Sequence, residues 1–222
     1  MTDVGVLLLV RHGQGSVGTS NYDELSERGR RQSRLVGARL ARADLRVSQT
    51  WCGALARQRE TADAVLAELG LPMDGLHVDA RLDEYDHLGI LAADGTGDPF
   101  ASAVTPESRR ALQSVLDEAI VRWIGGGADY PEPHSAFTAR VDAAVAELTI
   151  LPGTTMAVTS AGVIAVACAR LTGLPGDRWP ALARVVVNTS VTKLITGRTG
   201  THLLTFNDHA HLEDDRSLVT YR

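Results

Sequence analysis

The chain has 222 residues, of which 44% are hydrophobic and 22% charged, and its formal net charge at pH 7 is −5. This length suits one well-buried domain over residues 1–222 and is too short for two domains of ordinary size. The negative charge and the lack of a run of Lys or Arg argue against nucleic acid as a partner.

The apolar segments argue against a membrane protein. The first of them, Val6 to Val10, is far shorter than a signal sequence or a membrane span, and later ones are interrupted by charge. A soluble, cytoplasmic protein that has no membrane partner is therefore expected. The two cysteines, Cys52 and Cys168, are far apart and lack ligand-like spacing, so neither a disulfide framework nor a zinc site is expected.

The first half of the chain alternates predicted strands and helices. Residues 4–10 form a continuous apolar run, which is typical of a strand that helices cover on both faces. Ser26 is a suitable N-cap for a helix to about residue 43. A strand over 45–51 and a helix over 57–69 follow. Residues 86–104 are rich in Asp, Gly and Pro and show no period, which predicts a long loop beside the site.

The second half continues this alternation. The start Thr105-Pro106-Glu107 favours a helix to about residue 125. Another helix from about Ser135, a strand over 154–159 and a helix to about residue 171 follow. Further strands are predicted, over residues 184–187, 191–196 and 201–206. The pattern predicts an α/β fold: a three-layer α/β/α sandwich on a mostly parallel sheet with helices on both faces.

Polar residues directly after an apolar strand are the first candidates for a site, because ligands in such sheets lie beyond the carboxyl ends of the strands. Here the first strand ends in Arg11-His12-Gly13. Gly13 allows a close backbone approach, Arg11 offers a fork of donors for an anion, and His12 offers a nucleophile or an acid-base group. A histidine that merely hydrogen-bonds a neighbour explains the same residues equally well.

Several motifs, taken together, resemble those of a known family. They are Leu9 to Gln14 (LVRHGQ), Leu25 to Gln32 (LSERGRRQ), Leu55 to Ala62 (LARQRETA), Arg81 to Asp86 (RLDEYD), Val158 to Ile164 (VTSAGVI) and Asn207 to Leu212 (NDHAHL). In order and spacing they resemble the histidine phosphatase superfamily, which is also called phosphoglycerate mutase-like. The resemblance covers nearly the whole chain.

The resemblance implies roles for the matching residues. His12 would be the nucleophile that becomes transiently phosphorylated. Arg11 and Arg57 would bind the non-bridging oxygens and neutralise charge in the transition state. Glu84 would be the general acid and base. Alternatives stay open: Arg57 as a solvated helix residue with Arg59 in its place, and Asp83 or Asp86 in place of Glu84.

One position departs from the family pattern. Where most members carry a second histidine after the strand, this chain has Ser160, whose hydroxyl donates a hydrogen bond but brings no positive charge. The chain is thus expected to belong to a subgroup with Ser in place of the second catalytic His. His87, His209 and His211 are candidates to replace that histidine, although each is more often an ordinary loop residue. Ser16 is a further candidate for contact with the phosphate.

These features lead to one main functional hypothesis. We expect a metal-independent phosphatase that hydrolyses a phosphorylated small molecule through a phosphohistidine, without a cofactor. The His-x-His pair near the C-terminus lacks a settled third ligand, so no metal is expected. A phosphoglycerate mutase is the close alternative, although residues 86–104 do not resemble a mutase substrate region. A weakened phosphate-binding regulatory protein is the other alternative, and a homodimer is compatible with the sequence.

Overall fold

The computed structural model describes residues 5–16, 23–43, 45–95 and 106–221. By its internal contacts the chain forms two compact units, one made of Met1–Glu84 with Val141–Arg222 and the other of Tyr85–Arg140. The expectation of a single domain over residues 1–222 stays a prediction. No helix among the described residues is long and apolar enough to cross a membrane.

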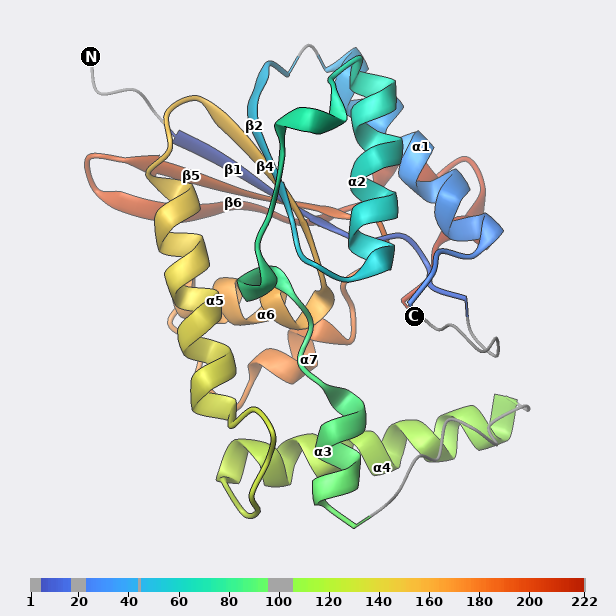
Figure 1. Cartoon of the computed structure of the whole chain (residues 1–222), viewed down its shortest axis with the longest axis vertical. Helices are drawn as coiled ribbons and strands as arrows, with labels where there is room; N and C mark the ends of the chain where they lie inside the picture. The colour runs from blue at the N-terminus through green and yellow to red at the C-terminus, as the bar shows by residue number, and fades with distance from the viewer. Residues whose placement is uncertain (1–4, 17–22, 44, 96–105, 222) are drawn as a thin grey trace. The chain divides into compact units, whose positions relative to one another are not determined.

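A six-stranded mixed sheet forms the centre of the first unit (Figure 1). Its strands are β1 (Gly5–Arg11), β2 (Val47–Cys52), β3 (Leu76–Val78), β4 (Thr154–Thr159), β5 (Val191–Gly197) and β6 (Gly200–Asp208). Their order is β3-β2-β4-β1-β5-β6. The first four strands of this order are parallel, whereas β5 and β6 form an antiparallel hairpin at the β1 edge. The predicted mostly parallel sheet is therefore confirmed, and β5 and β6 give it an antiparallel edge.

Helices cover both faces of this sheet. The helices of the first unit are α1 (Glu27–Arg42), α2 (Ala56–Leu69), α6 (Ala161–Leu171), α7 (Trp179–Ala183) and the second half of α5 (His134–Thr149). Leu8 and Val10 pack with Val36 of α1 and Val65 of α2. Leu7 points to the opposite face by strand alternation and is equally buried, and α6 contacts β1. Burial on both faces explains the continuous apolar sequence of β1.

The predicted ends of two helices are confirmed. The Ser26 hydroxyl accepts a hydrogen bond of 3.0 Å from the backbone N–H of Gly29 and thereby caps α1. Gly70 ends α2 in the left-handed conformation, with a φ of 66°. Ser26 thus fixes where α1 begins, and Gly70 fixes where α2 ends.

The second unit is helical. It contains α3 (His87–Ala93), α4 (Pro106–Gly125) and the first half of α5. The Trp123 ring lies 5.5 Å from that of Tyr85 and 5.6 Å from that of Phe137, between ring centroids, and these rings form an aromatic core. The Trp123 indole N–H donates to the carbonyl of Glu132 at 2.7 Å, so its polar atom is also satisfied.

The prediction of a long loop over residues 86–104 is wrong in its first part. Residues 87–93 form α3, which Asp86 caps by accepting the N–H of Gly89 at 2.9 Å. Only Ile90 and Leu91 of this helix are buried, and two adjacent apolar residues show no period in the sequence. Residues 96–104 of the predicted loop lie outside the described residues.

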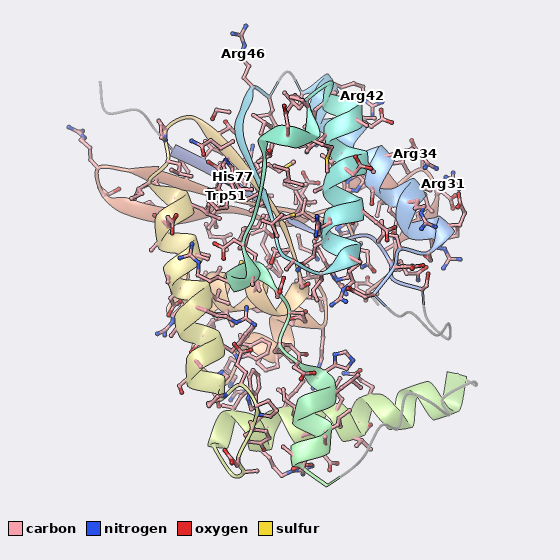
Figure 2. The ribbon with its side chains drawn as sticks, viewed as in Figure 1. Arg31, Arg34, Arg42, Arg46, Trp51 and His77 are labelled. Carbon is pink, nitrogen blue, oxygen red and sulfur yellow. The ribbon has the colours of Figure 1, made fainter. Side chains whose placement is uncertain are left out.

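A second prediction is also wrong. Residues 184–187 are not a strand but follow α7 as a turn and loop, in which the N–H of Val187 donates to the side-chain oxygen of Asn207 at 2.8 Å. Two of the valines that suggested a strand, Val186 and Val187, are buried there by tertiary packing, whereas Val185 is exposed. The structure also contains the short strand β3, which was not predicted. There His77 stacks on Trp51 of β2 with ring centroids 4.6 Å apart (Figure 2).

Candidate active site at the carboxyl end of the sheet

Three parallel strands bring the candidate residues to one edge of the sheet. Arg11, the last residue of β1, is paired in register with Thr159, the last residue of β4. The backbone N–H of His12 donates to the carbonyl of Thr159 at 2.9 Å. The residues that follow the two strands, His12 and Ser160, therefore leave the sheet side by side. Strand β2 ends at the same edge, because Cys52 is paired with Val158.

The hydrogen bonds of the His12 ring define its tautomer. Nδ1 lies 2.7 Å from the carbonyl oxygen of Gly13, and Nε2 lies 3.1 Å from Nε of Arg57. A carbonyl oxygen can only accept and a guanidinium N–H can only donate. The proton is therefore on Nδ1, and the lone pair is on Nε2. The carbonyl of His12 in turn accepts a bond of 3.0 Å from the Asn188 side chain.

The surroundings of His12 keep its imidazole neutral. Burial lowers the pKa of His12 well below its usual value of 6.5, and the positive charges of Arg57 and Arg11 lower it further. The hydrogen bond to the Gly13 carbonyl acts in the opposite direction but is the smallest of these effects. A neutral imidazole with a lone pair on Nε2 is the form that can act as a nucleophile.

Arg57 lies at the beginning of α2 and is only 8% exposed, so the alternative of a solvated helix residue is wrong. Its Nη1 forms an ion pair of 2.6 Å with Oδ1 of Asp23. The other Asp23 oxygen accepts the N–H of Ala56 at 2.8 Å and so caps α2. The rival cation, Arg59, is exposed. Sequence reasoning missed Asp23, because a single acid before a helix carries no signal that it binds an arginine far along the chain.

The Arg11 side chain is buried and is bound to the C-terminal part of the chain. Its Nη1 donates to the carbonyl of Val186 and, at 2.7 Å, to that of Tyr221. Both protons of this nitrogen are thereby used. A phosphate would have to be bound through Nε or Nη2 of Arg11.

Ser160 is fully buried and accepts a hydrogen bond of 2.9 Å from Nε2 of Gln58, the residue that follows Arg57. Sequence reasoning missed Gln58, because glutamine at a helix start has no characteristic catalytic pattern. Glu84 lies beside Ser160, since its Oε2 accepts the N–H of Gly162 at 3.1 Å in the first turn of α6.

The rivals of Glu84 have other contacts. Asp83 accepts the N–H of Ala54 at 2.6 Å, in the loop between β2 and α2. Asp86 caps α3 in the second unit. Glu84 contacts the segment of Ser160. The assignment of the acid-base role to Glu84 is a prediction that this placement supports.

The remaining candidates have contacts of their own. The pKa of His211 is lowered by burial to about 4, so this residue is neutral at neutral pH, and its Nε2 is 3.0 Å from the Thr189 hydroxyl. Nδ1 of His209 is 2.7 Å from the carbonyl of Asn207. His87 begins α3 in the second unit. Ser16 donates its backbone N–H to Glu24 at 2.7 Å, and its contact with phosphate stays a prediction.

The described residues contain no group of three or more His, Cys, Asp and Glu side chains that could hold a metal ion. Both cysteines are buried free thiols. Burial raises the pKa of Cys52 to about 11 and that of Cys168 to about 12. Both are therefore protonated at neutral pH and are poor metal ligands and poor nucleophiles.

Comparison with known proteins gives a family and a fold. The family model of the histidine phosphatase superfamily (branch 1) matches residues 7–209. No curated protein matches the chain in sequence.

Solved structures match almost the whole chain. YhfR of Bacillus stearothermophilus has a TM-score of 0.70 and 23% identity, and the match covers 94% of this chain and 100% of that one. A mycobacterial glucosyl-3-phosphoglycerate phosphatase, in complex with inorganic phosphate, has a TM-score of 0.63 and 26% identity over 93% and 98%. A phosphoglycerate mutase from Bacillus anthracis has a TM-score of 0.63 and 18% identity over 95% and 96%.

Proposed function

Because the chain belongs to branch 1 of the histidine phosphatase superfamily, we propose that it is a metal-independent phosphatase that hydrolyses a phosphate monoester through a phosphohistidine on His12. The observation that carries this proposal is the state of the His12 ring. Its Nδ1–H is directed at the Gly13 carbonyl, and its Nε2 lone pair lies at the carboxyl edge of the sheet beside Arg57.

The reaction proceeds in two displacements. The hydrogen bond from Arg57 to Nε2 of His12 is released, and Nε2 attacks phosphorus while the bond to the ester oxygen breaks. Glu84 gives its proton to the leaving alkoxide. Glu84 then takes a proton from a water molecule, whose oxygen attacks phosphorus and releases inorganic phosphate from Nε2. Arg57, Arg11 and Ser160 donate hydrogen bonds to the non-bridging oxygens, on which charge is spread in both transition states.

The substrate class follows from the same site. Two buried guanidinium groups and a buried hydroxyl at one strand edge suit a dianionic phosphoryl group. The related mycobacterial phosphatase that was crystallised with inorganic phosphate supports a phosphorylated small molecule as the substrate.

The test is hydrolysis of p-nitrophenyl phosphate in EDTA by the wild-type chain, His12→Ala and His202→Ala. His202 is an exposed histidine of β6 that contacts Thr199, and it serves as the matched control. We expect turnover by the wild type and by His202→Ala, and none by His12→Ala. Rapid quenching in alkaline detergent with radiolabelled substrate should trap a phosphoryl group that is stable to base and labile to acid on the wild type and on His202→Ala, and none on His12→Ala.

Each alternative has its own outcome in this test. Equal turnover by His12→Ala would overturn the phosphohistidine mechanism. Loss of turnover in EDTA would overturn the metal-independent mechanism. A chain that binds phosphate without turnover would instead be a regulatory protein, and rapid interconversion of phosphoglycerates with little release of phosphate would indicate a mutase.

A further inference from the structure

We propose that Gln58 is a positioning residue that fixes the hydroxyl of Ser160 as a hydrogen-bond donor to the phosphoryl group. The inference rests on the proposed function, because it takes a phosphoryl group at His12 as given. Gln58 itself does not reach the reacting atoms in this account. It acts through the direction of the Ser160 O–H bond.

Among the described residues the Gln58 side-chain amide has three hydrogen-bond partners, and all lie in the first unit. Its Nε2 is 3.0 Å from the carbonyl oxygen of Leu82 and 2.9 Å from the Ser160 hydroxyl. Its Oε1 is 3.3 Å from the backbone N–H of Leu55. Gln58 and Ser160 are both 0% exposed, so water does not compete for these bonds at the surface.

Two of these neighbours determine which way the amide points. The Leu82 carbonyl can only accept a hydrogen bond, and the Leu55 N–H can only donate one. Exchanging the oxygen and nitrogen of the Gln58 amide would place an acceptor against the Leu82 carbonyl and a donor against the Leu55 N–H. Nε2 therefore faces Leu82 and Ser160, and the orientation does not depend on the Ser160 contact itself.

The orientation of Gln58 makes the Ser160 oxygen an acceptor, so the proton of that hydroxyl must point elsewhere. It does not go to the Leu82 carbonyl, because Thr159 Oγ1 also donates to that oxygen, at 2.6 Å, and a carbonyl has two lone pairs. It does not go to the amide of Gln58, whose Nε2 is itself a donor. In the proposed arrangement it points to the side where His12 follows the neighbouring strand, and the phosphoryl oxygens bind there.

Gly53 provides independent support, because it leaves the space that Gln58 occupies. A Cβ on residue 53 would lie 1.9 Å from Oε1 of Gln58. Gly53 is the residue that follows β2, and its N–H is fixed by the carbonyl of Val158 at 3.1 Å. Gln58 can therefore adopt this conformation only because residue 53 has no side chain.

The test is a double-mutant cycle read out by binding of orthovanadate, a phosphate analogue, in isothermal titration calorimetry. The variants are Ser160→Ala, Gln58→Met and the double variant, with Gln113→Met in the second unit as the matched control. Met is close to Gln in size but carries no hydrogen-bond donor. Both side chains are uncharged, so the net charge does not change. In Gln58→Met the Leu82 carbonyl loses a donor, and the Ser160 proton can turn toward it and away from the anion.

We expect each single variant to weaken vanadate binding about tenfold, as for the loss of one hydrogen bond to a charged group. The double variant should bind no more weakly than either single variant, because both changes remove the same donor. Gln113→Met should bind as the wild type does. If Gln58→Met does not fold, Gln58→Asn serves instead, because its shorter side chain does not span Leu82 and Ser160.

The outcomes separate this inference from the proposed function. Wild-type affinity in Gln58→Met, or a weakening of about a hundredfold in the double variant, would overturn the role of Gln58. In both cases vanadate binding by the wild type and the role of His12 would stand. A wild-type chain that binds neither vanadate nor phosphate would instead contradict the proposed function.

Discussion

The Nε–H of Arg57 donates a hydrogen bond of 3.1 Å to Nε2 of His12, the ring nitrogen that carries the lone pair. Arg57 thus orients the proposed nucleophile and lowers its pKa. The next residue, Gln58, bonds the hydroxyl of Ser160. Two consecutive residues at the start of α2 therefore donate hydrogen bonds to the residues that directly follow two neighbouring strands, β1 and β4. The beginning of this helix positions the site as much as the sheet does.

Replacing Arg57 with Gln should reduce kcat/KM for p-nitrophenyl phosphate about 10² to 10³-fold, which is typical when one donor to transition-state charge is lost. The acid limb of the pH profile of kcat/KM should also move to higher pH. The reason is that the charge of Arg57 lowers the pKa of His12, so its removal lets His12 take up a proton at higher pH. Both effects are measured in one set of initial-rate profiles from pH 4 to 8.

The control for this variant is Arg59→Gln, which removes an exposed cation two residues away. We expect it to keep the wild-type rate and profile. A larger loss in Arg59→Gln than in Arg57→Gln would show that the wrong arginine has been assigned.

Replacing Asp23 with Asn tests whether this carboxylate holds Arg57 against His12. The ion pair of 2.6 Å would be lost, and we expect kcat/KM to fall about tenfold through misplacement of Arg57. The direction of the pH effect is diagnostic. Removing a negative charge by itself lowers the pKa of His12, whereas releasing Arg57 from the ring raises it. We expect the rise, seen as an acid limb at higher pH.

Asp215→Asn is the matched control, because it breaks an exposed ion pair of 3.1 Å, with Arg31, in the same unit. It should leave the profile unchanged. An acid limb that moves to lower pH in Asp23→Asn would show that Asp23 acts through its charge alone and not by positioning Arg57.

The sequence predicts the polar residues at the carboxyl end of β1 well, because a continuous apolar run and the glycine after His12 are local signals. It does not predict Gln58 or Asp23, whose partners are a hydroxyl and a guanidinium brought near only by the folded chain. Helix α3 was missed because its buried residues, Ile90 and Leu91, span less than one turn. The strand predicted at 184–187 was wrong for the related reason that buried valines also occur in loops.

The stability of the chain should fall in mild acid. His12 and His211 both have a lowered pKa in the folded state, for His211 to about 4, whereas in the unfolded chain both protonate near 6.5. Above pH 6.5 neither state is protonated, so there is no effect. Below pH 6.5 the unfolded chain takes up protons first, and the free energy of unfolding falls by about 1.4 kcal/mol per pH unit for each group.

Urea unfolding at pH 7, 6 and 5 measures this slope, and His211→Gln isolates one contribution. We expect the slope of this variant to be shallower than that of the wild type by about 1.4 kcal/mol per pH unit. His202→Gln, at an exposed position, should keep the wild-type slope. Equal slopes in all three proteins would show that His211 titrates normally in the folded state.

Replacing Gly53 with Ala tests the space around Gln58 without altering any polar group of the site. The added Cβ would lie 1.9 Å from Oε1 of Gln58 and 2.5 Å from Oδ1 of Asp83, so both side chains must move. We expect a loss of about 1 to 3 kcal/mol in the free energy of unfolding, which is typical of overpacking. We also expect weaker vanadate binding, because a displaced Gln58 no longer directs the Ser160 proton.

The two effects of Gly53→Ala should separate in the Ser160→Ala background. There the substitution should cost the same stability and no further vanadate affinity, since the donor that Gln58 directs is already gone. Gly75→Ala is the control, because a Cβ on Gly75 has nothing within 4 Å and should change neither quantity. Isothermal titration calorimetry measures the vanadate affinity, and urea unfolding measures the stability. Full vanadate affinity in a destabilised Gly53→Ala would mean that Gln58 packs the end of β2 without directing Ser160.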